Sequence, residues 1–195
     1  MSFSRFPLMV ALLLAGELGD ARALLQPSDW LDLARLSRGE VQVHSVGNGK
    51  YAGRVMAAIR VDASQQAIWA VMTDCPSAPK FVSWVVECEL LASPESGRVE
   101  IFRQEIKLAW YMPRLEHTFE LTYYPYEQID FRRLTGSPRQ FEGSWWLQPT
   151  SKATLVVYSV DLVPGFFVPR AVARRALRDE LPGTLLALRD RVEEP

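Results

Sequence analysis

Apolar residues recur mostly every three or four positions along the last stretch of the chain, residues 168–193. This spacing forms one stripe of an amphipathic helix. Pro169 suits the first turn of such a helix, whereas Pro182 lies within the pattern and is expected to bend it. The pattern predicts one long C-terminal helix that must lay its stripe on another layer of the protein. The stripe consists of Val168, Val172, Leu177, Leu181, Leu185, Leu188 and Val192.

Most of the chain before that helix alternates between apolar and polar residues, which is the two-residue period of a β-strand. The alternation is clearest in residues 114–124, with Leu115, Phe119 and Leu121 on one face and Glu116 on the other. We expect an α+β fold in which a curved antiparallel sheet of about six to seven strands wraps over the C-terminal helix. Strand patterns occur at 40–46, 51–61, 84–92, 98–110, 114–124, 128–134, 139–148 and 153–163.

Shorter helices are predicted before and between the strands. Residues 24–39 contain Pro27-Ser28-Asp29, a good helix start, and form a short leading helix. Two short helices follow the first long strand, one over 65–73 and one beginning at Lys80. No repeat, low-complexity tract or linker divides the chain, so residues 40–195 are predicted to form one domain.

The first 23 residues have the features of a secretory signal peptide. Arg5 precedes an apolar run over 6–15, and Ala21-Arg22-Ala23 has the small-x-small form of a cleavage site. The run is shorter than the roughly 20 residues that span a bilayer as a helix. We therefore expect cleavage after Ala23 and a periplasmic or secreted protein. The alternative is a buried N-terminal helix in a cytosolic protein.

Composition and charge are those of one soluble domain. The 195 residues are 48% hydrophobic and 23% charged, with a formal net charge of −1. A nucleic-acid-binding protein normally shows a clear basic excess, so nucleic acid is not an expected partner. The two cysteines, Cys75 and Cys88, either pair in an oxidising compartment or remain separate buried thiols. Together with two distant histidines, His44 and His117, they lack the spacing of a metal site, so no metal is expected.

Several segments, taken in their order along the chain, indicate a resemblance to a known family. They are Ile59-Arg60-Val61-Asp62-Ala63-Ser64, Ile68-Trp69-Ala70-Val71-Met72-Thr73-Asp74, Gly143-Ser144-Trp145-Trp146-Leu147-Gln148-Pro149, Thr154-Leu155-Val156-Val157-Tyr158, Phe167-Val168-Pro169 and Leu181-Pro182. Together they resemble the START-like helix-grip superfamily, also called SRPBCC, and within it the polyketide cyclase/dehydrase and coenzyme-Q-binding group. The resemblance covers about residues 39–192. Cys75-Pro76 departs from the aromatic residue that usually follows the aspartate, here Asp74.

The resemblance implies a deep apolar cavity between the sheet and the long helix, which holds a hydrophobic ligand such as a lipid, a quinone or a polyketide. The aromatic residues on the predicted inner faces are either solid core or the walls of such a pocket. With His117, they form the candidate ligand-binding set: Trp110, Phe119, Tyr123, Phe131, Trp145, Tyr158, Phe166 and Phe167.

Signals for catalysis are few. The chain has no G-x-S-x-G elbow, H-E-x-x-H pair or Walker loop. His117 lies on an apolar face, where it is a satisfied core residue, a hydrogen-bonding group for a ligand carbonyl, or a base. Asp161, on the apolar face of the last strand, is the second candidate base and needs a partner. The arginines considered as its partners are Arg103, Arg132 and Arg133.

Three functions follow from these observations. We expect a periplasmic, non-enzymatic protein that carries a hydrophobic ligand, without a cofactor. The second hypothesis is a cyclase/dehydrase-type enzyme acting on an aromatic or polyketide-like substrate. The third is an interaction module whose core is filled by its own side chains. The arginines of the last helix form either a solvated face or a rim that makes a transient membrane contact; they are Arg170, Arg174, Arg175 and Arg178.

Overall fold

The computed structural model describes residues 30–46, 54–94, 97–107, 110–165 and 168–193. In this part of the chain, eight strands form one sheet in the order β1-β2-β8-β7-β6-β5-β4-β3, with all neighbours antiparallel. The strands are β1 (Gln42–Val46), β2 (Arg54–Val61), β3 (Val85–Ala92), β4 (Val99–Ile106), β5 (Leu115–Tyr124), β6 (Gln128–Gly136), β7 (Gln140–Pro149) and β8 (Thr154–Val163).

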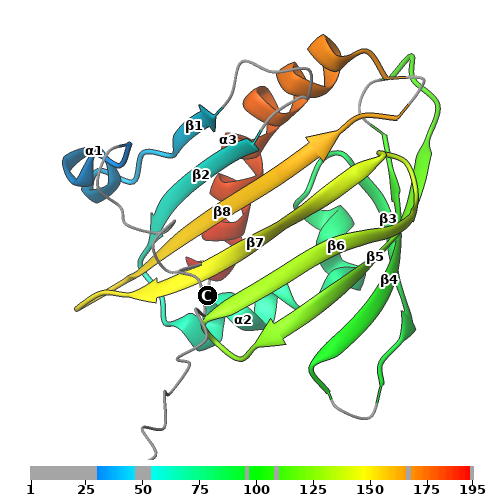
Figure 1. The fold of residues 1–195 in the computed structure, drawn as a ribbon. Coiled ribbons are helices and arrows are strands. Elements are labelled where there is room, and N and C mark those ends of the chain that lie inside the picture. The colour runs from blue at the N-terminus through cyan, green and yellow to red at the C-terminus, as the bar shows by residue number, and fades with distance from the viewer. Residues whose placement is uncertain (1–29, 47–53, 95–96, 108–109, 166–167, 194–195) are drawn as a thin grey trace, which may run out of the picture.

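The curved antiparallel sheet predicted from the alternation is therefore confirmed (Figure 1). The predicted number of six to seven strands was slightly too low, since the described part of the chain holds eight. Even the short edge strand β1 pairs with β2 over five consecutive positions, from Gln42 to Val46, so it is a full member of the sheet.

The helices of the described residues are α1 (Leu33–Ser37), α2 (Gln65–Met72), the 3₁₀-helix η2 (Cys75–Lys80) and α3 (Arg170–Glu193). α2 begins where its sequence predicts, because the Ser64 side chain accepts a hydrogen bond from the amide of Ala67. The second short helix was misplaced, since it begins at Cys75 rather than at Lys80. A proline at its start, Pro76, is tolerated because the first turn of a helix leaves amides without internal partners.

α3 and α2 lie on the same side of the curved sheet (Figure 1). Leu181, Leu185 and Leu188, three members of the predicted stripe of α3, are buried in one core cluster with Val55 and Ile59 of β2. The helix continues through Pro182. None of the helices in the described ranges combines the length and hydropathy that a membrane crossing requires.

β8 is covered on both of its faces. Tyr158 and Val160 belong to the core cluster that includes α3, whereas Leu155 and Val157 pack with Leu36 of α1. Successive side chains of a strand point to opposite faces. The residues of β8 therefore divide into one set that faces α3 and one set that faces away from it.

Gly143 in β7 permits a close approach that any larger residue would prevent. A β-carbon at this position would overlap the backbone carbonyl of Ser159 and the ring of Phe131. Glycine thus lets the Phe131 ring lie against β7. This ring forms part of the wall of a cavity.

Candidate functional site

Three cavities follow one another between the sheet and α3. The largest has a volume of about 160 Å³ and contacts Leu188 in the C-terminal half of α3. The middle cavity, of about 60 Å³, contacts Leu181, and the smallest, of about 40 Å³, contacts Ala173 near the start of the helix. The three cavities therefore follow the axis of α3.

The cavities also share wall residues. Trp84, Phe141 and Tyr158 line both the largest and the middle cavity. Ile106, Pro138 and Leu162 line both the middle and the smallest cavity. The three spaces are thus neighbours, with Glu180 and His117 among the polar residues in the wall of the middle one.

The wall of the largest cavity is mostly apolar. The residues with polar side-chain groups in this wall include Asp74, Gln104, Thr184 and Tyr158. Burial raises the pKa of Tyr158, so its hydroxyl stays protonated at neutral pH. The apolar members include Val71 and Met72 of α2, Ala78, Phe81 and Val82 in and after η2, and Phe119, Leu121, Ile129, Phe131, Phe141 and Trp145 of the sheet.

Four of the aromatic residues that the sequence places in a ligand site do line the largest cavity: Phe119, Phe131, Trp145 and Tyr158. Their rings are close to one another, with 5.7 Å between the centroids of Phe131 and Tyr158 and 4.2 Å between those of Trp145 and Tyr158. Phe166 and Phe167 lie outside the described residues.

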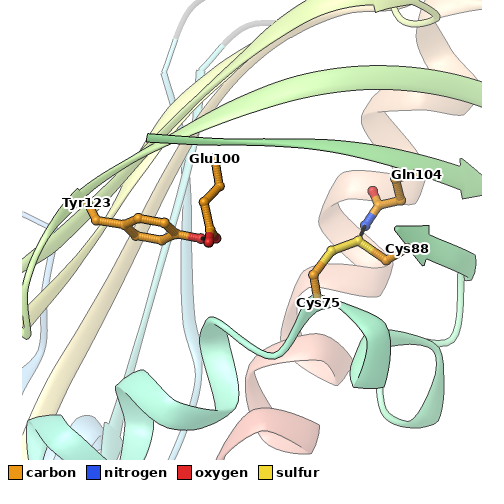
Figure 2. The surroundings of a disulfide bond; sticks show 5 residues. All are labelled: Cys75, Cys88, Glu100, Gln104 and Tyr123. Atoms are coloured by element: carbon orange, nitrogen blue, oxygen red, sulfur yellow. Dashed lines mark hydrogen bonds between the residues drawn. A yellow bond between two sulfur atoms is a disulfide. The ribbon is translucent and has the colours of Figure 1, made fainter. Parts of the chain in front are cut away.

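Tyr123 is buried but does not line any of the three cavities. Its ring meets the edge of Trp69, with 5.7 Å between centroids, and its hydroxyl donates to Glu100 Oε2 at 2.7 Å. Figure 2 shows the Tyr123 and Glu100 side chains pointing toward each other. Burial and the neighbouring carboxylate raise the pKa of this tyrosine. Its role is in packing beside the site.

The assignment of Trp110 to the cavity wall was wrong. Strand β4 ends at Ile106, so Trp110 lies in the turn after it and its side chain is 87% exposed. The neighbouring Tyr111 is 65% exposed, and the two rings meet edge to face at 5.6 Å. This exposed aromatic pair follows Ile106, which lines the smallest cavity.

Asp161 is also outside the cavities. It lies on the face of β8 that points away from α3, where Arg54 donates to its carboxylate from Nη2 at 2.6 Å and from Nε at 3.0 Å. Its partner is therefore none of the three arginines considered from the sequence. A base role toward a ligand beside α3 is excluded by this orientation.

His117 lies in the wall of the middle cavity and is 2% exposed. Phe119 and Phe141 flank its ring, with centroids 5.3 Å and 5.4 Å away. Neither ring nitrogen has a hydrogen-bond partner among the described residues. Burial, and then the positive charge of Arg133, lower the pKa of His117 to about 4. The imidazole is therefore neutral at neutral pH and offers one donor and one acceptor.

A disulfide joins Cys75, at the start of η2, to Cys88 in β3, with 5.6 Å between the Cα atoms (Figure 2). The amide of Gln104 in β4 points toward it, with Nε2 3.9 Å from the Cys88 sulfur. Cys75 and Gln104 both line the largest cavity. The bond therefore ties one wall of that cavity to the edge of the sheet.

Sequence reasoning missed the wall contributed by η2 and the residues that follow it. Ala78, Phe81 and Val82 line the largest cavity, yet no regular pattern marks a 3₁₀-helix of this length. Phe141 was also missed, although it alternates with Trp145 on the same face of β7 and could have been included. Within the described ranges, no group of three or more potential ligands could hold a metal ion.

A family model described as polyketide cyclase / dehydrase and lipid transport matches residues 61–189. The match spans the chain from the end of β2 to near the end of α3 and so includes the cavity walls. None of the curated proteins matches the chain.

Solved structures share the fold at low sequence identity. A STAR-related lipid transfer protein from Xanthomonas axonopodis (fragment 25–204) is 16% identical, with a TM-score of 0.70 over 79% of this chain and 94% of that one. The Zhui aromatase/cyclase from Streptomyces sp. R1128 is 16% identical, with a TM-score of 0.63 over 72% and 93%. Human STARD10 is 12% identical, with a TM-score of 0.67 over 90% and 80%.

Proposed function

The chain belongs to the polyketide cyclase / dehydrase and lipid transport family, and on that premise we propose that it binds a hydrophobic small molecule in the cavities beside α3 without converting it. The observation that carries this proposal is the largest cavity, with its wall of aromatic and aliphatic side chains. Burial of apolar ligand surface there contributes about 25 cal/mol per Å² to binding. A lipid transfer protein and an aromatase/cyclase are both among the proteins of similar fold, so lipid-like, quinone-like and polyketide-like molecules are all ligands to test.

The volume limits the apolar body of the ligand. The largest cavity, at about 160 Å³, is close to an engineered apolar cavity of about 150 Å³ that binds benzene. In the conformation described, it fits one ring or a hydrocarbon chain of similar volume. A whole two-chain lipid would require the walls to move apart.

The lowered pKa of His117 and the orientation of Asp161 favour binding over catalysis. A general base works best with a pKa near the operating pH, and the pKa of His117 is lowered to about 4. The other candidate base, Asp161, faces away from α3 and pairs with Arg54. The presence of a cavity also favours binding over an interaction module with a filled core.

Export to the periplasm or beyond is part of this proposal. Residues 1–23, which carry the signal-peptide pattern, lie outside the described residues. The disulfide between Cys75 and Cys88 supports the proposal, because such bonds persist mainly in oxidising compartments. N-terminal sequencing of the protein from periplasm and cytoplasm tests it. A mature chain that begins at Leu24 is the expected result.

Contact with a membrane during loading is the last part of the proposal. The exposed pair Trp110 and Tyr111 supports it, because these side chains favour the membrane–water interface. The contribution of the arginines of α3 stays a prediction, since the side chains of Arg170 and Arg174 are not described. Arg175 pairs with Asp179 on an exposed part of the helix.

Native mass spectrometry of the protein purified from its own compartment tests the binding function. A co-purifying hydrophobic molecule, identified after solvent extraction, is the expected result. Two variants sharpen the test. Ala78→Trp places a large ring in the wall of the largest cavity and should fill it. Ala92→Trp, which adds the same ring at an exposed end of β3, is the control. The first should lose the molecule and the second should keep it. A protein that carries nothing and takes up neither lipids nor quinones would contradict the proposed function.

A further inference from the structure

Two buried side chains in the wall of the middle cavity have polar groups without partners. His117 is 2% exposed, and neither of its ring nitrogens makes a hydrogen bond within the described part of the chain. Tyr158 is 6% exposed, no described residue forms a hydrogen bond with its hydroxyl, and burial is the whole cause of its raised pKa. Buried polar groups in proteins are nearly always hydrogen-bonded. The middle cavity is therefore a place where a ligand would supply the missing bonds.

The curvature of the sheet brings the two residues to one cavity, although His117 belongs to β5 and Tyr158 to β8. Phe141 of β7 lines the same cavity, and its ring centroid is 5.4 Å from that of His117. Tyr158 also lines the largest cavity, so it lies where the two spaces adjoin. A ligand that fills the largest cavity and extends into the middle one therefore passes Tyr158 and meets the wall that contains His117.

The cavity walls also limit the charge that the ligand can carry. No lysine or arginine of the described residues lines any of the three cavities, whereas Asp74 lines the largest and Glu180 the middle one. A carboxylate in the middle cavity would meet the carboxylate of Glu180, with no cation in the wall to offset it. An ammonium would lie beside the His117 ring, whose pKa is already lowered by the positive charge of Arg133. Because a charge that leaves water without a partner is strongly disfavoured, we expect a neutral polar group there.

Among neutral groups, a hydroxyl matches these side chains best. The neutral imidazole of His117 offers one donor and one acceptor, and the hydroxyl of Tyr158 also both donates and accepts. A ligand hydroxyl can donate to one of them and accept from the other. A carbonyl or ether oxygen only accepts, so it would leave the unprotonated nitrogen of His117 without a donor. The middle cavity, at about 60 Å³, exceeds the roughly 10–15 Å³ that a single water needs in the same measure, so a CH₂–OH group fits.

We propose that the ligand is a hydrophobic alcohol or phenol, with its hydroxyl bonded to His117 and Tyr158 in the middle cavity and its hydrocarbon in the largest cavity. This inference rests on the proposed binding function and names its ligand class. The ligand hydroxyl donates to the unprotonated ring nitrogen of His117 and accepts from the hydroxyl of Tyr158. Its apolar body is one ring or a short chain, because the largest cavity has a volume of about 160 Å³.

Four molecules that share a phenyl ring on a short chain test the proposal by NMR titration of the full chain. 3-Phenylpropanol and 2-phenylethyl methyl ether are isomers, and of the two only the alcohol can donate a hydrogen bond. 3-Phenylpropanoate and the 3-phenylpropylammonium ion carry a negative and a positive charge on a similar chain. We expect the alcohol to bind about fivefold more tightly than the ether, which is the contribution of one hydrogen bond. It should bind at least about tenfold more tightly than either ion, because each ion must lose its hydration.

Two variants separate the two hydrogen bonds. His117→Phe removes the acceptor, so the advantage of the alcohol over the ether should disappear while the ether still binds. His44→Phe, which changes an exposed histidine of β1, should retain the advantage. Tyr158→Phe removes the donor and should weaken the alcohol and the ether alike, by about fivefold. Tyr123→Phe should weaken neither, because this buried tyrosine lines none of the three cavities.

A second measurement on the wild type needs no variant. The chain has two histidines, and the unprotonated ring nitrogen of a neutral histidine changes its ¹⁵N shift when it accepts a hydrogen bond. The alcohol should move this signal of His117 further than the ether does. An unmoved signal with alcohol bound, equal affinity for alcohol and ether, or tightest binding by an ion would refute the hydroxyl site and leave the proposed function standing. If none of the four molecules binds, the hydroxyl site is refuted, and the proposed function falls with it only if lipids and quinones also fail to bind.

Discussion

The disulfide between Cys75 and Cys88 fastens η2, which lines the largest cavity, to the edge strand β3. It closes a loop with a sequence separation of 13 residues. Replacing both cysteines by serine should lower the free energy of unfolding by about 2–3 kcal/mol, because the unfolded chain gains freedom. Urea unfolding of the variant and of the wild type measures the difference. Chemical reduction of the wild type should reproduce the loss, and an unchanged unfolding midpoint in both experiments would contradict it.

His117 should make stability depend on pH. Its pKa is lowered to about 4 in the folded protein, whereas an unfolded histidine titrates near 6.5. Between these values the unfolded chain binds more protons, so stability falls as the pH drops from about 6.5 to about 4, by up to about 3 kcal/mol. Above pH 6.5 this contribution is constant.

Replacing His117 by phenylalanine removes the titrating group and tests this contribution. The variant should show a weaker loss of stability below pH 6.5. At pH 7 it should be about 1–2 kcal/mol more stable, because two unsatisfied nitrogens are removed. Urea unfolding at several pH values measures both effects. His44→Phe, which changes an exposed histidine of β1, should keep the wild-type profile. Identical profiles for His117→Phe and the wild type would contradict the prediction.

Asp161 should be dispensable for ligand binding. Asp161→Asn weakens the pair with Arg54 on the face of β8 that points away from α3. A partly exposed ion pair contributes about 0–1 kcal/mol, so a loss of stability within this range is expected. Affinity for a hydrophobic probe, measured by calorimetric titration, should stay within about twofold of the wild type. A large loss of affinity with unchanged stability would show that this carboxylate acts on the ligand after all.

Gly143 should not tolerate a side chain. Gly143→Ala would place a methyl group against the Ser159 carbonyl and the Phe131 ring. The overlap should destabilise the protein by about 2 kcal/mol or more, measured by urea unfolding, and should shift Phe131 in the cavity wall. Gly97→Ala is a comparison from an exposed turn, where strain comes from its φ of 62° rather than from a contact. Equal stability of Gly143→Ala and the wild type would contradict the close approach.

The exposed pair Trp110 and Tyr111 should contribute to membrane binding and not to the stability of the fold. Replacing both by alanine should change the free energy of unfolding by less than about 0.5 kcal/mol, because both are mostly exposed. The fraction bound to phosphatidylcholine–phosphatidylglycerol vesicles should fall about tenfold in co-sedimentation, since the rings supply interfacial apolar surface. Tyr124→Ala, an exposed aromatic at the other end of β5, serves as the control. Equal vesicle binding of all three proteins would argue against membrane contact through this pair.

Periodicity was sufficient to predict the sheet and the long helix, because each buries one regular set of side chains. It could not locate Trp110, since the alternation of β4 continues past Ile106 in the sequence whereas the hydrogen-bonded ladder ends there. It could not orient Asp161 either. β8 is apolar on both faces, because α1 covers one and α3 the other, so hydrophobicity alone does not tell which face meets the cavity.

The details of the candidate site could not be predicted, because they depend on contacts between residues that are far apart in the chain. His117 was recognised as a polar residue on an inner face, but its lack of partners depends on Phe119 and Phe141 flanking the ring. The nearness of Arg133 results from the pairing of β5 with β6, which includes an irregularity between Thr118 and Phe119. The distance between Cys75 and Cys88 likewise depends on where η2 lies against β3.

Pro182 lies between the part of α3 that lines the middle cavity and the part that lines the largest cavity. It has no amide hydrogen, so the backbone carbonyl four residues earlier, at Arg178, receives no helical bond from it. Leu181, on one side, lines the middle cavity, and Leu188, on the other, lines the largest. A hinge at this proline would let the first half of α3 swing outward while the second half stays packed on β2. Such a motion would open the middle and smallest cavities to solvent and leave the largest cavity closed.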